Sequence, residues 1–307
     1  MGLPAKAREK LATNPVEFIK QQLGEFVRTS PDNRLPFIRD YVMWDEPLIG
    51  FADGDDPIFT EYKTIIAPEH LTPREALAGA YGKSTEDMPV RLSVISWILP
   101  AVEETRKSNR LQVSAPSRLW SHTRWYGEKF NEKMRVHVVA LLSSAGYLAT
   151  APFSQPYFKT YTNEKGPYSN WSERHVAYAA GLGTFSLSDG LITERGIAHR
   201  CGNVVTSLVL PKSPRTADGP YSNCLFYAGA SCRACIERCP AGAITEKGHD
   251  KNRCQRYLHE IGYTLESLTK EGYNNEKSVV GCGLCQTKVP CEFENPTNKL
   301  KKSLNKG

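Results

Sequence analysis

The chain has 307 residues, 40% of them hydrophobic, and a formal net charge of +6. This length allows a large buried core and excludes a small secreted protein that depends on disulfides. The modest charge gives no argument for nucleic-acid binding, and no run of about 18 apolar residues is present, which excludes a membrane-spanning helix. Because no signal-like apolar segment follows Met1, we expect a soluble, cytoplasmic protein.

The N-terminal third predicts a helix, a loop and a strand. Asn14 and Pro15 are typical of a helix start, and the apolar residues after them share one helical face: Val16, Ile19, Leu23, Phe26 and Val27. Residues 40–64 mix aromatic, acidic and proline residues without a clean period, which predicts a structured loop or lid. Residues 90–99 are apolar and precede Pro100, so we expect a buried central strand there.

The middle of the chain predicts further helices and strands. Apolar residues recur at helical spacing over 130–145, and Gly146 ends this helix. A second helix over 173–180 ends at Gly181. Two strands and a polar linker follow, at 190–193, 203–210 and 211–220.

Eight of the nine cysteines lie in two groups near the C-terminus. The first group is Cys224 with the run Cys232-x2-Cys235-x3-Cys239-Pro240, and the second is Cys254 with Cys282-x2-Cys285-x5-Cys291. Eight thiolates are the ligands of two four-iron four-sulfur (4Fe-4S) clusters, and in a CxxCxxxCP run the cysteine before proline binds the other cluster. We therefore predict two ligand sets: Cys224, Cys232, Cys235 and Cys291 for one cluster, and Cys239, Cys254, Cys282 and Cys285 for the other.

Disulfides and zinc are the alternative uses of these cysteines, and we rank both below iron-sulfur clusters. Disulfide frameworks suit small secreted chains rather than one of this length with an odd cysteine count. Paired zinc knuckles would not use CxxxCP and CxxxxxC spacings. Cys201 is left over, and a lone cysteine is most often a small buried hydrophobic residue.

The distribution of cysteines predicts two domains. The first 200 residues contain none, whereas the last third carries the two cysteine groups as a ferredoxin-like pseudo-duplication. We place an α/β domain at 1–215 and an iron-sulfur domain with two 4Fe-4S clusters at 216–307. A dedicated electron carrier would scarcely need the long segment before the cysteines, so we favour an enzyme, a reductase. The alternative is a ferredoxin-like electron carrier, and the family resemblance described next adds a corrinoid-reactivating partner without substrate chemistry of its own.

The motifs resemble those of the epoxyqueuosine reductases and, more distantly, those of the reductive dehalogenases. They are AGLGTFSLSDGLIT at 180–193, GNVVTSLVLP at 202–211, CxxCxxxCPAGAIT at 232–245, RCQRYL at 253–258 and CGLCQ at 282–286. The resemblance covers roughly residues 85 to 295. It implies a nitroreductase-like α/β domain that holds cobalamin, followed by a ferredoxin-like domain whose two clusters supply electrons. It also implies a turn that lines the corrin edge: Gly181, Leu182, Gly183, Thr184, Phe185 and Ser186.

The resemblance further implies a reductive cleavage or deoxygenation that needs a proton donor. The family places its catalytic acid in an Asp-Tyr-His element just before the helix expected at 130–145. Here that segment is Arg124-Trp125-Tyr126-Gly127-Glu128, so Glu128 and Tyr126 are the candidate acids. The alternative is that Glu128 is an exposed residue in the first turn of the helix.

The substrate and the electron donor are inferred from the same resemblance. The chain ends soon after the second cysteine group, without the helical-repeat extension with which the resembled family binds transfer RNA (tRNA). We therefore expect a small-molecule substrate, with tRNA less favoured, and an external electron donor of the ferredoxin or flavodoxin type. A cluster reductase that works without cobalamin is a further alternative.

Overall fold

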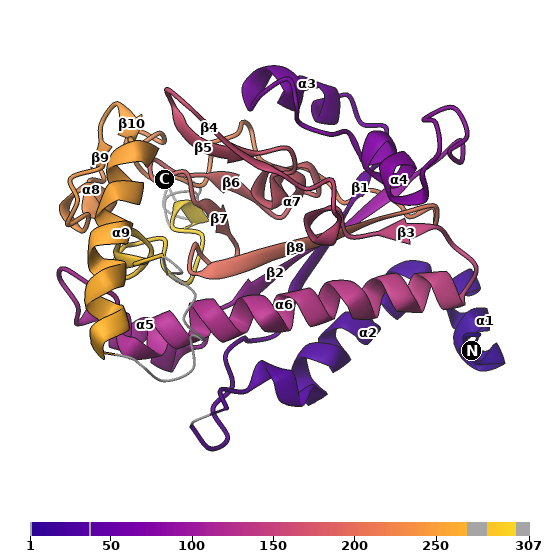
Figure 1. The fold of residues 1–307 in the computed structure, drawn as a ribbon, viewed down its shortest axis with the longest axis horizontal. Helices are drawn as coiled ribbons and strands as arrows, with labels where there is room; N and C mark the ends of the chain where they lie inside the picture. Colours follow the sequence, from indigo (N-terminus) through magenta and orange to yellow (C-terminus); the bar gives the residue numbers. More distant parts are fainter. Residues whose placement is uncertain (1, 37, 269–280, 299–307) are drawn as a thin grey trace, which may run out of the picture.

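A four-stranded antiparallel sheet forms the centre of the protein (Figure 1). The computed structural model describes residues 2–36, 38–268 and 281–298. The strand order is β1 (Leu48–Asp53), β2 (Ser93–Pro100), β8 (His199–Thr206) and β3 (Ala149–Thr150), and each neighbouring pair is antiparallel. All residues of β2 are buried, because it lies between β1 and β8 and helices cover both faces of the sheet. The predicted central strand is confirmed, but it spans Ser93–Pro100 rather than 90–99, and Val90 is exposed.

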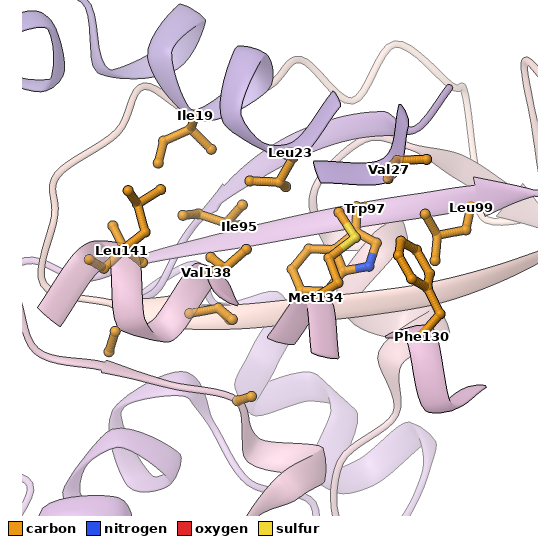
Figure 2. Close-up of a cluster of buried hydrophobic side chains, with 14 of the residues drawn as sticks. Ile19, Leu23, Val27, Ile95, Trp97, Leu99, Phe130, Met134, Val138 and Leu141 are labelled. Carbon is orange, nitrogen blue, oxygen red and sulfur yellow. The ribbon is translucent and has the colours of Figure 1, made fainter. Parts of the chain in front are cut away.

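One face of the sheet is covered by α2 (Pro15–Thr29) and the long helix α6 (Arg118–Ser144). Figure 2 shows their apolar side chains meeting those of β2. They are Ile19, Leu23 and Val27 from α2, Phe130, Met134, Val138 and Leu141 from α6, and Ile95, Trp97 and Leu99 from β2. The Asn14 side chain accepts a hydrogen bond from the Glu17 N–H at the start of α2, as expected from the sequence.

The opposite face of the sheet is covered by α3 (Ile58–Ile65), α4 (Pro73–Tyr81) and α7 (Glu173–Ala179). They pack around a second buried cluster that includes Phe59, Leu77, Trp171 and Val176. The predicted helix at 173–180 is confirmed, and Gly181 follows it with a left-handed φ of 72°. The structure is therefore a mixed α/β fold, as expected.

Three short hairpins and several helices complete the described structure. The hairpins are β4 (Thr160–Asn163) with β5 (Gly166–Ser169), β6 (Gly183–Phe185) with β7 (Leu191–Thr193), and β9 (Ile244–Thr245) with β10 (Gly248–His249). The helices are α1 (Ala5–Thr13), α5 (Glu103–Arg110), α8 (Ala234–Glu237) and α9 (Lys251–Leu268), with 3-10 turns η1 (Pro31–Asn33), η2 (Pro152–Ser154) and η3 (Leu284–Gln286). No helix in the described ranges has the length and apolar character needed to span a bilayer.

Three sequence-based boundaries are wrong. Residues 40–64 are not a lid, because they contain strand β1 and helix α3, which are too short to show a period. Helix α6 begins at Arg118 rather than at 130, because the Ser117 hydroxyl caps it by accepting from the Trp120 N–H at 3.0 Å. Strand β8 ends at Thr206 and starts at His199, earlier than the predicted 203–210.

The segment 281–298 returns from the cysteine-rich part to pack against the α/β part. The Glu292 carboxylate is 1% exposed and pairs with Arg110 at 2.7 Å, and the Asn109 side chain donates to the Cys282 carbonyl at 3.2 Å. The Ile197 N–H also donates to the Cys291 carbonyl at 2.8 Å. These contacts join the two regions closely, and the domain boundary at 215/216 stays a prediction.

Candidate functional site

The first predicted set of cysteines lies together around the start of α8. Burial is the main cause that raises the pKa of Cys291, and neighbouring thiols are the next causes: Cys224, Cys235 and Cys232. Burial likewise raises the pKa of Cys235 to about 11, followed by the effect of Cys224 and Cys232. The four thiols that share one electrostatic neighbourhood are thus the four assigned to one cluster from the sequence.

The second predicted set lies together between α9 and η3. Burial raises the pKa of Cys254 to about 11, and Cys282 and Cys239 are the next causes. Burial also raises the pKa of Cys285, and Cys282, Cys254 and Cys239 are the next causes. Buried thiolates that repel one another are stable as anions only beside strong positive charge, such as that of cluster iron.

The spacing of these thiols is not that of a single-ion site. No group of three or more metal-ligating side chains in residues 2–36, 38–268 and 281–298 is close enough to hold one ion. In a cubane each cysteine binds a different iron, so the four sulfur atoms lie farther apart than around one ion. The assignment of two 4Fe-4S clusters therefore stays a prediction.

The start of α6 positions the second cysteine motif. Gly283 in the Cys-Gly-Leu-Cys run has a φ of 63°, and a Cβ there would overlap the Trp120 indole ring. The Trp120 indole N–H also donates to the Gly281 carbonyl at 3.0 Å. Glycine is therefore required at 283 both by its left-handed backbone and by the ring packed against it.

A cavity of about 350 Å³ lies where α6, α7, β8 and η3 meet, and we call it the arginine cavity. The guanidinium groups of Arg124, Arg174 and Arg200 line it. Its other walls come from both regions of the chain: Phe153, Ser169, Trp171, Ser172, Glu173, Gly190, Leu191, Ile197, His199, Cys201 and Gln286. The sequence analysis missed this site, because its arginines are far apart in the chain.

Cys201 lies on β8 opposite Ile98 and is 7% exposed, which confirms that it is buried. Burial raises its pKa to about 12, so the thiol stays protonated. Its sulfur lies 3.8 Å from Nδ1 of His199, whose Nε2 is 2.8 Å from the Leu191 carbonyl oxygen. Burial lowers the pKa of His199 to about 4, so this imidazole is neutral.

Glu128 belongs to a network of ion pairs beside the arginine cavity. It lies in the middle of α6, and its carboxylate is 2.8 Å from Arg135 and 2.6 Å from Arg200. Burial alone would raise its pKa, but the guanidinium groups of Arg200, Arg135 and Arg124 outweigh burial and lower it. The alternative of an exposed first-turn residue is wrong, and the ionised carboxylate is a weak proton donor in this state.

Glu173 belongs to the same network, but its pKa is raised rather than lowered. It pairs with Arg135 at 2.9 Å, and Arg135 is fully buried and shared with Glu128 and Glu132. Burial raises the pKa of Glu173 above its usual range, against the pull of Arg135. A carboxyl group that lines a cavity and has a raised pKa suits general acid work.

Tyr126, the other candidate acid, lies elsewhere on α6. Its ring packs against the apolar core of the α2 face, and the Lys129 ammonium lies 5.5 Å from the ring centroid. Burial raises its pKa. Tyr126 is not among the residues that line the arginine cavity, so its role as a proton donor stays a prediction.

A second cavity, of about 810 Å³, adjoins the arginine cavity, and we call it the aromatic cavity. Its wall is rich in aromatic side chains: Tyr62, Phe153, Phe158, Tyr168, Tyr178, Phe185 and Tyr221. Phe153, Ser169, Ser172 and Arg174 line both cavities, so the two spaces are neighbours. His175 also lines it, and burial lowers the pKa of this histidine to about 3, so it is neutral.

The glycine turn expected at the corrin edge is mostly packed against the chain itself. A Cβ at Gly181 would overlap the Pro214 carbonyl, and one at Gly183 would meet the Ile192 carbonyl. Thr184 is buried and accepts from the Asn223 N–H at 2.8 Å, and Ser186 is buried beside Ser188. Phe185 faces the aromatic cavity. The role of residues 181–186 in binding a corrin stays a prediction.

The sequence is similar to curated epoxyqueuosine reductases, although no family model matches it. It is 33% identical over 145 residues to the enzyme of Synechocystis, which covers 45% of each chain. It is 35% identical over 121 residues to that of Gloeobacter violaceus, covering 38% of this chain and 35% of the relative. Each match spans less than half of the relative. The resemblance to epoxyqueuosine reductase-like proteins is confirmed.

Two solved structures of epoxyqueuosine reductases are also similar. That from Bacillus subtilis has a TM-score of 0.40 and 16% identity, and the match covers 90% of this chain and 66% of the other. The other, with a tRNA-Tyr stem loop modified by epoxyqueuosine, has a TM-score of 0.44 and 18% identity, with the same coverage. Because a tRNA stem loop is the partner there, our expectation that tRNA is disfavoured against a small molecule is wrong.

Proposed function

We propose that this chain is an iron-sulfur reductase that acts on epoxyqueuosine in tRNA. The observation that carries the proposal is the grouping of eight cysteine thiols into two sets of four beside two adjoining cavities. The curated relatives supply the substrate class, since they are named for the reduction of epoxyqueuosine. Removal of the epoxide oxygen as water takes two electrons and two protons, and both must reach the site.

Electrons would enter through a ferredoxin-like part with two 4Fe-4S clusters and pass to a nitroreductase-like α/β part. Gln286, next to Cys285, lines the arginine cavity. Ile197 also lines it, and its N–H donates to the Cys291 carbonyl at 2.8 Å. Residues adjacent to ligands of both predicted clusters therefore form part of the cavity wall.

Cobalamin is the cofactor that we propose for the aromatic cavity. The observation that supports it is the size of this space and its aromatic wall, which would cover an extended flat ring system. Phe185, Tyr178 and Tyr221 would hold the ring from the side of the glycine turn. When bound, the corrin supplies a strongly reducing, nucleophilic metal centre for opening a carbon–oxygen bond.

A side chain of the protein would donate a proton to the leaving oxygen. Breaking a carbon–oxygen bond by reduction builds negative charge on oxygen, which a nearby acid must neutralise. Glu173 is our first candidate, because its carboxyl group lines the arginine cavity and its pKa is raised. Glu128 and Tyr126 stay in the set to be tested, although the pKa of Glu128 is lowered.

The activity is tested with a tRNA anticodon stem loop that carries epoxyqueuosine. Protein purified without oxygen is reduced with dithionite, with and without added cobalamin, and the loss of one oxygen atom is followed by mass spectrometry. Conversion that requires both the clusters and cobalamin supports the proposal. Conversion without cobalamin would remove the cofactor from it. No conversion by protein with full cluster and cobalamin content would overturn the proposed function.

A further inference from the structure

The loop between α5 and α6 carries two of the most exposed apolar side chains in the described part of the chain. Leu111 is 81% exposed and Val113 is 78% exposed. Figure 1 shows this loop beside α9, against the cysteine-rich part. Single exposed apolar residues are common on protein surfaces, but two that lie two residues apart on one loop point to a contact surface. We call Leu111 and Val113 the apolar patch.

The loop is held in place by neighbours of the second cysteine set. The Arg238 guanidinium, one residue before a predicted ligand, donates to the Gln112 carbonyl at 2.8 Å. Tyr257 lies three residues after Cys254 on α9, and its hydroxyl donates to the Ser114 carbonyl. The carbonyl groups on either side of Val113 therefore bind side chains that flank two ligands of one predicted cluster. The apolar patch lies on the outer surface next to that cluster.

The first cysteine set, in contrast, lies beside the aromatic cavity. Tyr221 lines this cavity, and its carbonyl accepts from the Cys224 N–H at 3.0 Å. The two sets meet at α8, where Cys235 of the first set and Cys239 of the second are four residues apart. Electrons that enter at the second set would therefore reach the proposed cofactor through the first set.

A small surface is sufficient for a partner that delivers electrons. Electron-transfer complexes are short-lived and bury little area, because the partner has to approach the cluster closely and then leave. Their contact surfaces combine an apolar centre with a polar, charged rim. The apolar patch supplies such a centre beside the second cysteine set.

The charge of the neighbouring helix indicates the chemistry of the partner. Residues 250–261 carry three basic and two acidic side chains: Lys251, Arg253 and Arg256 against Asp250 and Glu260. Arg253 and Arg256 are both exposed. A slight basic excess, in a chain with a net charge of +6, favours a partner with an acidic surface.

We propose that the apolar patch and the exposed arginines of α9 bind a small acidic electron-transfer protein, which reduces the cluster of the second cysteine set. The proposal rests on the two clusters of the proposed function and not on its substrate. Each reduced carrier gives up one electron and the cluster takes it. Two carriers in turn supply the two electrons that removal of the epoxide oxygen requires.

The test follows electron transfer from flavodoxin hydroquinone to the full chain, purified without oxygen, by stopped-flow absorbance. Flavodoxin is the probe because its blue semiquinone product absorbs in the red, where iron-sulfur clusters absorb little. Dithionite is the second reductant, because a small molecule needs no docking surface. We expect both to reduce the clusters. The rate with flavodoxin should fall as ionic strength rises, since salt screens the attraction between the two proteins.

Variants then assign the contact to the apolar patch. The double variant Leu111→Ser/Val113→Ser should slow reduction by flavodoxin about tenfold, because the apolar centre of the contact is lost, and should leave the rate with dithionite unchanged. Arg256→Gln should slow it less and weaken the salt dependence. Val90→Ser is the matched control, since Val90 is 90% exposed and lies beside Arg74 of α4.

Equal rates with flavodoxin for the double variant and the wild type would overturn the proposal. An equal loss of rate with dithionite would also overturn it, because the defect would then lie in the clusters. Wild-type protein that dithionite reduces and flavodoxin does not would overturn the acidic partner. Absence of any cluster that dithionite reduces would overturn the proposed clusters as well, so the two failures are distinguished. If the double variant loses iron, Val113→Ser alone carries the test.

Discussion

The two halves of α6 differ in what they contact and in how strictly they must be placed. The C-terminal half sends Met134, Val138 and Leu141 into the apolar core beneath β2 (Figure 2). The N-terminal half carries Trp120 to the second cysteine motif and Arg124 to the arginine cavity. Apolar packing has no direction and tolerates small shifts, whereas ion pairs and cluster ligands lose their function when they move. One helix therefore connects a core that tolerates small shifts in position to a site that does not.

The largest expected effect is the loss of an iron-sulfur cluster when one of its predicted cysteine ligands is replaced. Protein purified without oxygen should contain about eight iron atoms and about eight labile sulfides per chain. Cys235→Ser should lower both toward about half, because one of its cluster's four ligands is removed. Cys201→Ser is the control and should keep the full content, since Cys201 belongs to neither set. Loss of a cluster in Cys201→Ser would show that the ligand assignment is wrong.

The next largest effect is expected at the proton donor, which belongs to the charged site and not to the apolar core. Glu173→Gln should slow turnover by about 10²- to 10⁴-fold with unchanged iron content, because the leaving oxygen would lack its acid. In the wild type the acid form of Glu173 is needed, so the rate should fall as pH rises through its raised pKa. Glu128→Gln and Tyr126→Phe are assayed beside it. A larger loss in either of these than in Glu173→Gln would move the donor to that residue.

Arg135 tests how strongly the charged network depends on one side chain. Arg135→Met leaves Glu128, Glu132 and Glu173 without their shared partner, which should lower the free energy of unfolding by about 3–5 kcal/mol. Without the guanidinium the carboxyl pKa values rise above those of the unfolded chain. The deficit is therefore greatest at about pH 8 and shrinks as pH falls toward about 5, because the acids become neutral.

Urea unfolding at the two pH values measures this deficit. Arg28→Met is the matched control, because the Arg28 side chain is 64% exposed and lies 4.0 Å from Glu46. An exposed pair of this kind contributes about 0–1 kcal/mol, so little change is expected. A deficit in Arg135→Met that does not depend on pH would contradict the role of the three carboxylates.

The smallest expected effect is a loss of stability from substitutions in the C-terminal half of α6. Met134→Ala should lower the free energy of unfolding by about 2–4 kcal/mol, because its fully buried side chain leaves a cavity. Val136→Ala on the same helix is the control, since Val136 is 59% exposed and should change stability by about 0.5 kcal/mol or less. We expect both variants to retain wild-type iron content. Loss of iron in Met134→Ala would mean that the two halves are coupled.

Sequence reasoning was most successful where local pattern and chemistry agree. The helix after Asn14 and the buried strand before Pro100 each follow from a period and an end signal within a few residues. It was less successful at 40–64, where Gly50 and prolines interrupt short elements. It also missed the first half of α6, because that half buries polar side chains rather than an apolar stripe. A period of apolar residues cannot reveal a helix that faces a charged cavity.

The sequence by itself predicts the ligand chemistry and its count, since eight cysteines with these spacings divide into two sets of four. It also determined the main elements of the α2 and β2 core. Only the tertiary structure decided which charges meet. Arg124, Glu173 and Arg200 come from α6, α7 and β8, and no spacing in the chain predicts that they border one cavity. Their electrostatic interactions depend on distance and burial in three dimensions, which only the folded chain sets.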